Sequence, residues 1–139
     1  MTFVLHNSVA LSWCFHDEQT PSVLAVLERL TETGAVAPLL WPLEALNGLL
    51  VAQRRRRLTA DQCIVLAGFL RDLPITLDPD TALQAWAPTA RLAERFALSL
   101  YDATYLELAH RRQFPLATLD RPLRTAAANL GLELLPHAP

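Results

Sequence analysis

The sequence predicts an α/β protein with a central, mostly parallel sheet of four to five strands and helices on both faces. Short apolar runs alternate with longer helical patterns along the whole chain. No hairpin signal joins two neighbouring runs, so the strands are expected to be parallel. A length of 139 residues and an apolar content of 52% are sufficient for one domain with a buried core. One domain covering residues 1–139 is therefore expected.

The first strand and helix are expected at the start of the chain. Residues 3–5 form a continuous apolar run, which is typical of a strand covered on both faces. Ser8 is a suitable N-cap for the helix that follows. His6 therefore stands at the carboxyl end of a central strand, which is where doubly wound α/β proteins place their chemistry.

The later elements follow from capping residues, apolar spacing and helix breakers. Thr20 is expected to cap a helix that Gly34 ends, and Thr59 begins a capping box with Gln62. Pro88 interrupts a helical pattern and predicts either a kink or two shorter helices. The remaining strands are expected at 35–38, 74–77, 116–119 and 132–135, and the remaining helices at 21–33, 41–57, 59–72, 80–96, 99–112 and 121–130.

Composition excludes several classes of protein. No apolar run approaches the about 20 residues needed to span a bilayer, and the start lacks the features of a signal peptide. We therefore expect a cytoplasmic protein without a membrane anchor. Cys14 and Cys63 do not have the CxxC or Cys/His spacing of zinc ligands, so two buried thiols are favoured over a zinc site or a disulfide.

Charge gives no global sign of nucleic-acid binding, because the formal net charge is only -2. All twelve cations are arginine, which suits phosphate recognition, although a compositional bias would give the same count and is favoured. Four consecutive arginines, 54–57, end the helix that is expected to begin at Trp41. Helix dipoles favour cations at this end, so a solvated helix end is favoured over an RNA contact.

Three carboxylates are candidates for function. Glu44 and Asp102 fall in the first turn of a helix, and Asp120 could be an N-cap, so each also has a structural explanation. Strand direction nevertheless brings them together. His6 and Asp120 directly follow strands, and Glu44 follows the second strand closely, so all three lie near the carboxyl edge of the sheet. The helix of Asp102 leads into the strand at Leu116, so it must run from the carboxyl edge back to the amino edge. Its N-terminal end, with Asp102, therefore lies at the same carboxyl edge.

Three acids on one edge of a sheet would repel each other without a cation between them. Carboxylate oxygens are the ligands that Mg²⁺ and Mn²⁺ prefer. Metal ions held in this way activate water and neutralise charge on phosphate oxygens. Phosphodiester hydrolysis is therefore the leading chemistry.

The sequence resembles the PIN-domain family, in particular VapC-type toxin ribonucleases of type II toxin-antitoxin pairs. The matching segments lie in order along essentially the whole chain, at 4–13, 42–47, 99–105 and 117–120. The resemblance implies a three-layer α/β/α fold and a metal-dependent endoribonuclease that hydrolyses single-stranded RNA. It also implies Mg²⁺ or Mn²⁺ as cofactor, a homodimer, and a cognate antitoxin protein as partner.

By residue, the resemblance implies that Glu44, Asp102 and Asp120 hold the metal and act in catalysis, with Ser8 and Thr118 as supporting polar groups. The departure is His6, which stands where the family pattern has an aspartate ligand. An imidazole offers nitrogen where Mg²⁺ prefers oxygen and removes one of four negative charges. Activity is therefore expected to be impaired, and His6 is open to two interpretations, a structural side chain or a ligand.

The alternative to an endoribonuclease is a catalytically silent PIN-like module that binds an antitoxin or RNA. A receiver-type signalling domain shares the layered architecture, but it calls for a lysine near its end and this chain has none. Apolar helices predict an interface between two copies, because one small sheet is not expected to cover them all. The residues concerned are Leu24, Leu27, Leu49, Val51, Leu66 and Phe69.

Overall fold

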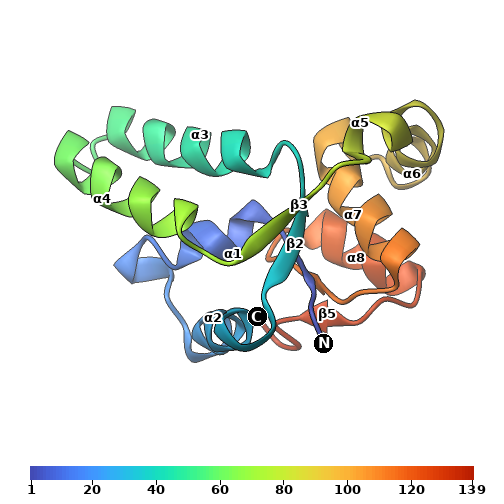
Figure 1. Cartoon of the computed structure of the whole chain (residues 1–139), viewed down its shortest axis with the longest axis horizontal. Helices are drawn as coiled ribbons and strands as arrows, with labels where there is room; N and C mark the ends of the chain where they lie inside the picture. The colour runs from blue at the N-terminus through green and yellow to red at the C-terminus, as the bar shows by residue number, and fades with distance from the viewer.

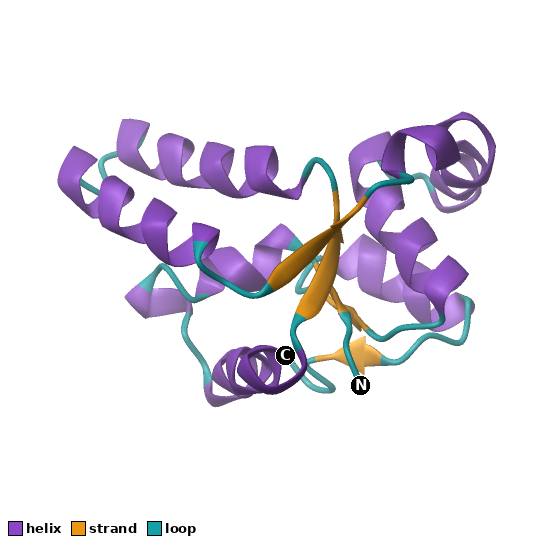
Figure 2. Cartoon of the chain, viewed as in Figure 1, coloured by secondary structure: helices purple, strands orange, loops and turns teal.

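The computed structural model describes all 139 residues and contains one five-stranded sheet in the order β3-β2-β1-β4-β5. Every neighbouring pair of strands is parallel, which confirms the predicted sheet (Figure 2). The short apolar run at the start of the chain forms the central strand. The strands are β1 (Val4–Leu5), β2 (Ala35–Pro38), β3 (Ile75–Asp78), β4 (Leu116–Ala117) and β5 (Leu134–Leu135).

Helices cover both faces of the sheet (Figure 1). The chain steps from β1 through β2 to β3 in one direction and from β4 to β5 in the other, so right-handed crossovers place the two helix groups on opposite faces. The first group contains α1 (Asn7–Ser12), the short 3-10 helix η1 (His16–Glu18), α2 (Pro21–Thr33), α3 (Trp41–Arg54) and α4 (Ala60–Arg71). The second group contains α5 (Thr81–Gln84), η2 (Ala85–Thr89), α6 (Ala90–Phe96), α7 (Leu100–Arg112) and α8 (Arg121–Asn129).

Most of the predicted helix starts are confirmed. The side chains of Thr20, Ser99 and Asp120 each accept a backbone N–H of the helix that they cap, and Thr59 forms the full capping box with Gln62. The expected cap at Ser8 is wrong. His6 is the N-cap of α1, because its own ring nitrogen accepts the Ser8 N–H and Ser8 lies inside the helix.

The kink expected at Pro88 is present as a short π-helical turn, η2, between α5 and α6. A proline has no N–H to donate to the preceding turn, so the local widening removes a conflict in the hydrogen-bond ladder. Both η2 and α6 pack against α7.

Helix α7 lies at the centre of the second face. All of its residues from 103 to 109 are buried, because the sheet lies on one side of it and α6, η2 and α8 lie around the rest. This placement fixes both ends of α7 relative to the sheet. On the other face α1 and α3 approach closely at Gly48, where an added Cβ would meet the Leu11 side chain.

None of the helices combines the length and apolar composition needed to cross a membrane. Cys63 is buried and Cys14 is half-buried, and neither forms a disulfide. Leu49, expected at an interface, is instead a core residue that is 2% exposed.

Candidate active site

The candidate site lies at the carboxyl edge of the sheet, beyond β1 and β4. These neighbouring strands lead into helices on opposite faces, so their loops diverge and leave room between them. Such switch points are the usual ligand sites of parallel α/β sheets. The edge receives His6 from β1, and Thr118 and Asp120 from the loop that follows β4.

His6 is buried at the centre of this edge, and its residue is 5% exposed. Its Nδ1 accepts the backbone N–H of Ser8 at 3.3 Å, so the ring proton of the neutral imidazole is on Nε2. Nε2 then donates to Asp102 Oδ1 at 3.1 Å. Both ring nitrogens are therefore engaged, and neither has a free lone pair for a metal ion.

Asp102 reaches His6 from the first turn of α7. Its backbone N–H donates to the Ser99 hydroxyl at 3.0 Å, and this cap holds the turn in place. The hydrogen bond from His6 lowers the pKa of Asp102, against the opposing effect of partial burial. Asp102 is thus held as an anion at the helix N-terminus, where the helix dipole also favours it.

Glu44 joins the same site through Tyr105, a residue that the sequence analysis did not identify. The Tyr105 hydroxyl donates to Glu44 Oε1 at 2.6 Å, and the Tyr105 ring packs edge-on against the His6 ring at a centroid distance of 4.7 Å. Burial and the Glu44 carboxylate raise the pKa of Tyr105, so the phenol remains a donor. Its position one helical turn after Asp102 is the signal that could have identified it.

Ser8 and Thr118 connect His6 with Asp120. Their hydroxyl oxygens lie 2.8 Å and 3.1 Å from His6 Nδ1. The Ser8 hydroxyl also accepts the Leu119 N–H, and the Thr118 hydroxyl accepts the Asp120 N–H at 3.1 Å. We call the connected set of Glu44, Tyr105, His6, Asp102, Ser8, Thr118 and Asp120 the rim network.

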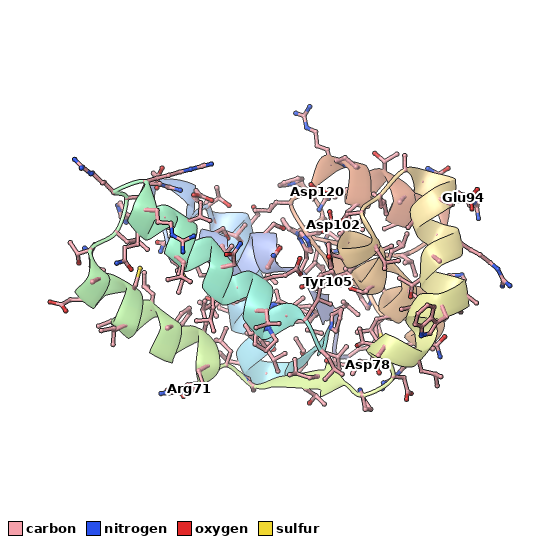
Figure 3. All side chains as sticks on the ribbon, turned by 90° about the horizontal axis from the view of Figure 1, so that it is seen from above. Arg71, Asp78, Glu94, Asp102, Tyr105 and Asp120 are labelled. Carbon is pink, nitrogen blue, oxygen red and sulfur yellow. The ribbon has the colours of Figure 1, made fainter.

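Asp120 completes the rim network as the N-cap of α8, with Oδ2 accepting the Leu123 N–H at 3.0 Å. Figure 3 labels it beside Asp102, at the adjacent N-terminal ends of α8 and α7. A cavity of about 400 Å³ opens next to Asp120, with His6 and Ser8 also in its wall. The site is therefore accessible from outside on the side of α1 and α3.

The structure brings every predicted site residue to one edge but gives each carboxylate a partner of its own. Asp102 is paired with His6, Glu44 with Tyr105, and Asp120 with the start of α8. No three His, Cys, Asp or Glu side chains are grouped so that they could hold a metal ion. The donor set as arranged around His6 therefore does not fit Mg²⁺ or Mn²⁺, and metal binding stays a prediction.

Comparisons with known proteins agree with this fold. No family model matches the sequence, and no curated protein sequence matches it. The crystal structure of PAE2754 from Pyrobaculum aerophilum, a PIN-domain protein, superposes with a TM-score of 0.63 at 20% sequence identity. The match covers 91% of this chain and 86% of PAE2754. The chain therefore has a PIN-like α/β fold.

Proposed function

We propose that this chain is an endoribonuclease of single-stranded RNA, the VapC-type toxin of a toxin-antitoxin pair, and that His6 impairs its metal-dependent cleavage. The observation that carries the proposal is the rim network. Four different segments of a PIN-like fold deliver positions 6, 44, 102 and 120 to one accessible edge of the sheet. The proposed location is the cytoplasm, where RNA is available.

The proposed reaction is hydrolysis of a phosphodiester bond, with Glu44, Asp102 and Asp120 as the catalytic carboxylates. The proposed cofactor is Mg²⁺ or Mn²⁺, which would activate water and neutralise the phosphate. Ser8 and Thr118 hold position 6 through their hydroxyl groups. His6 donates a hydrogen bond to Asp102 and brings no negative charge to the site. In the proposed site this hydrogen bond replaces the contact that a metal cation would make with the Asp102 carboxylate.

The test is His6→Asp. An aspartate restores an oxygen ligand and a negative charge, so we expect cleavage of fluorescent single-stranded RNA with Mg²⁺ or Mn²⁺ to rise about a hundredfold or more. Asp120→Asn added to His6→Asp should abolish the gain. Equal cleavage by the original chain and the His6→Asp variant would show that the histidine does not impair the site.

A second candidate function is a catalytically silent module that binds an antitoxin or RNA. The specific observation in its favour is the complete engagement of both His6 ring nitrogens, which closes the rim network without a metal ion. This candidate predicts that neither the original chain nor His6→Asp cleaves RNA, while both still bind an antitoxin.

The proposed partners are a second copy of this chain and an antitoxin. Helices α3 and α4 border an apolar groove of about 640 Å³, and its lining includes Arg71, the last residue of α4 (Figure 3). Leu46 and Ile64 line this groove, and the neighbouring Leu43 and Val65 are also exposed on the same helices.

Light scattering at micromolar concentration should give the mass of a dimer, and an antitoxin encoded nearby should co-purify. A monomer mass would argue against the homodimer.

A further inference from the structure

The arginine run at the end of α3 lies beside the candidate site. Arg55 and Arg57 line the cavity of about 400 Å³ whose other wall contains His6, Ser8 and Asp120. This volume is within the range of small-molecule sites in proteins, which is about 300 to 1,000 Å³. Arg55 is far from both His6 and Asp120 in the sequence, so the sequence alone does not place these residues around one cavity.

The two arginines differ in what they contact. Arg57 donates to Asp17 at 3.1 Å and Glu18 at 3.0 Å, and its guanidinium stacks on the Phe15 ring at 4.2 Å. The charge of Arg57 is therefore already paired with two carboxylates. Arg55 makes no ion pair and no side-chain hydrogen bond, although it is the C-cap of α3 and its backbone is fixed there.

Charge is arranged unequally along this cavity. Glu18 is already paired with Arg57, and Asp120 contributes negative charge at the end next to His6. A phosphate would be repelled by Asp120 and attracted by the unpaired cation of Arg55. Leu11, Val51 and Leu119 supply apolar wall in the same cavity, against which a base or sugar could pack.

We propose that this cavity binds one nucleotide unit of single-stranded RNA, with Arg55 holding its phosphate and the sugar directed toward Ser8 and Asp120. The proposal rests on the proposed function and names part of its substrate site. It also replaces the interpretation of this arginine as a solvated helix end. Arg55 is a positioning residue, because it touches a neighbouring phosphate and not the bond that is cleaved.

The experiment measures binding, not cleavage. A short fluorescent oligouridine is titrated with the whole protein in EDTA, over a series of salt concentrations, for the original chain, Arg55→Gln and Arg55→Lys. Arg91→Gln is the matched control, because Arg91 is an exposed, unpaired arginine on α6, on the other face of the sheet. Circular dichroism checks that each variant is folded.

Loss of one phosphate contact should weaken binding by Arg55→Gln about fivefold at low salt and reduce the slope of log Kd against log salt by about 0.7. Arg55→Lys should keep the slope, and Arg91→Gln should behave like the original chain. Equal losses in Arg55→Gln and Arg91→Gln would overturn the proposal, since they would indicate only a general effect of net charge.

Absence of any RNA binding by the original chain would also overturn this assignment. The proposed function would then still be decided separately, by whether His6→Asp gains RNA cleavage. Unchanged binding by Arg55→Gln combined with cleavage by His6→Asp would leave the nuclease assignment standing without this subsite.

Discussion

Helix α7 takes part in two polar networks, and they solve the problem of buried charge differently. Near its C-terminal end, Arg111 donates to Asp78 at 2.5 Å and to Glu107 at 2.9 Å. We call these three residues the ionic brace. At its N-terminal end, Asp102 and Tyr105 belong to the rim network, in which the imidazole of His6 and the phenol of Tyr105 supply the donors in place of an arginine.

The two networks also differ in their access to water. The Asp78 and Glu107 side chains are only 4% and 6% exposed, whereas that of Asp102 is 31% exposed. Their hydrogen bonds to Arg111 raise the pKa of its guanidinium, so the brace contains a permanent cation. The brace is therefore closed and structural. The rim network keeps carboxylate oxygens near solvent, as a site for an external ligand requires.

The largest expected effect is on the brace. Arg111→Met would leave two buried carboxylates without a cation, so we expect the free energy of unfolding to fall by about 3 kcal/mol or more. Urea denaturation followed by circular dichroism measures this change. Arg91→Met, at an exposed position, should cost less than about 0.5 kcal/mol. A similarly small loss in Arg111→Met would mean that water reaches Asp78 and Glu107, and the contrast between the networks would fail.

A smaller effect is expected when the rim network loses its own donor. His6→Asp places a second carboxylate beside Asp102, so in EDTA the free energy of unfolding should fall by about 2 kcal/mol. Mn²⁺ should restore much of this loss, because a bound cation stabilises the folded state. The loss in Arg111→Met should not respond to Mn²⁺. An His6→Asp variant with the same melting temperature in EDTA and in Mn²⁺ would contradict a latent metal site.

The sequence predicted the fold well, because each element had its own local signal. Apolar runs located the strands, side-chain caps located the helices that begin at Thr20, Thr59 and Ser99, and Pro88 located the kink. The direction of the parallel strands then placed Glu44, Asp102 and Asp120 at one edge. This step succeeded because chain topology alone decides which helix ends share an edge.

The contacts within the site could not be predicted in the same way. His6 caps α1 through a side-chain nitrogen, and no propensity scale anticipates a histidine cap before Ser8. The Tyr105 contact with Glu44 joins α7 to α3, and the Arg111 contact with Asp78 joins α7 to β3. Each such pair depends on the packing angles of separate elements. The cavity that Arg55 and Asp120 line together could not be predicted for the same reason.

The smallest expected effect is the pH dependence of the stability that Asp102 contributes to the fold. Its pKa is lowered in the folded chain, chiefly by the hydrogen bond from His6. A carboxyl group that is more acidic when folded stabilises the fold above its unfolded pKa of about 4, and this contribution disappears as the pH falls through the lowered value. Asp102→Asn removes the titrating group but can still accept the proton of His6.

The free energy of unfolding of Asp102→Asn should therefore be lower than that of the original chain near neutral pH, and the difference should shrink toward pH 3. We expect only about 0.5 kcal/mol at pH 7, because the carboxylate is partly exposed and water screens the interaction. Urea titrations at several pH values measure it, with Asp61→Asn, on the exposed first turn of α4, as the control. If Asp102→Asn is instead more stable at every pH, repulsion among the rim carboxylates outweighs the bond from His6. The rim network would then be a strained site, in contrast to the self-sufficient brace.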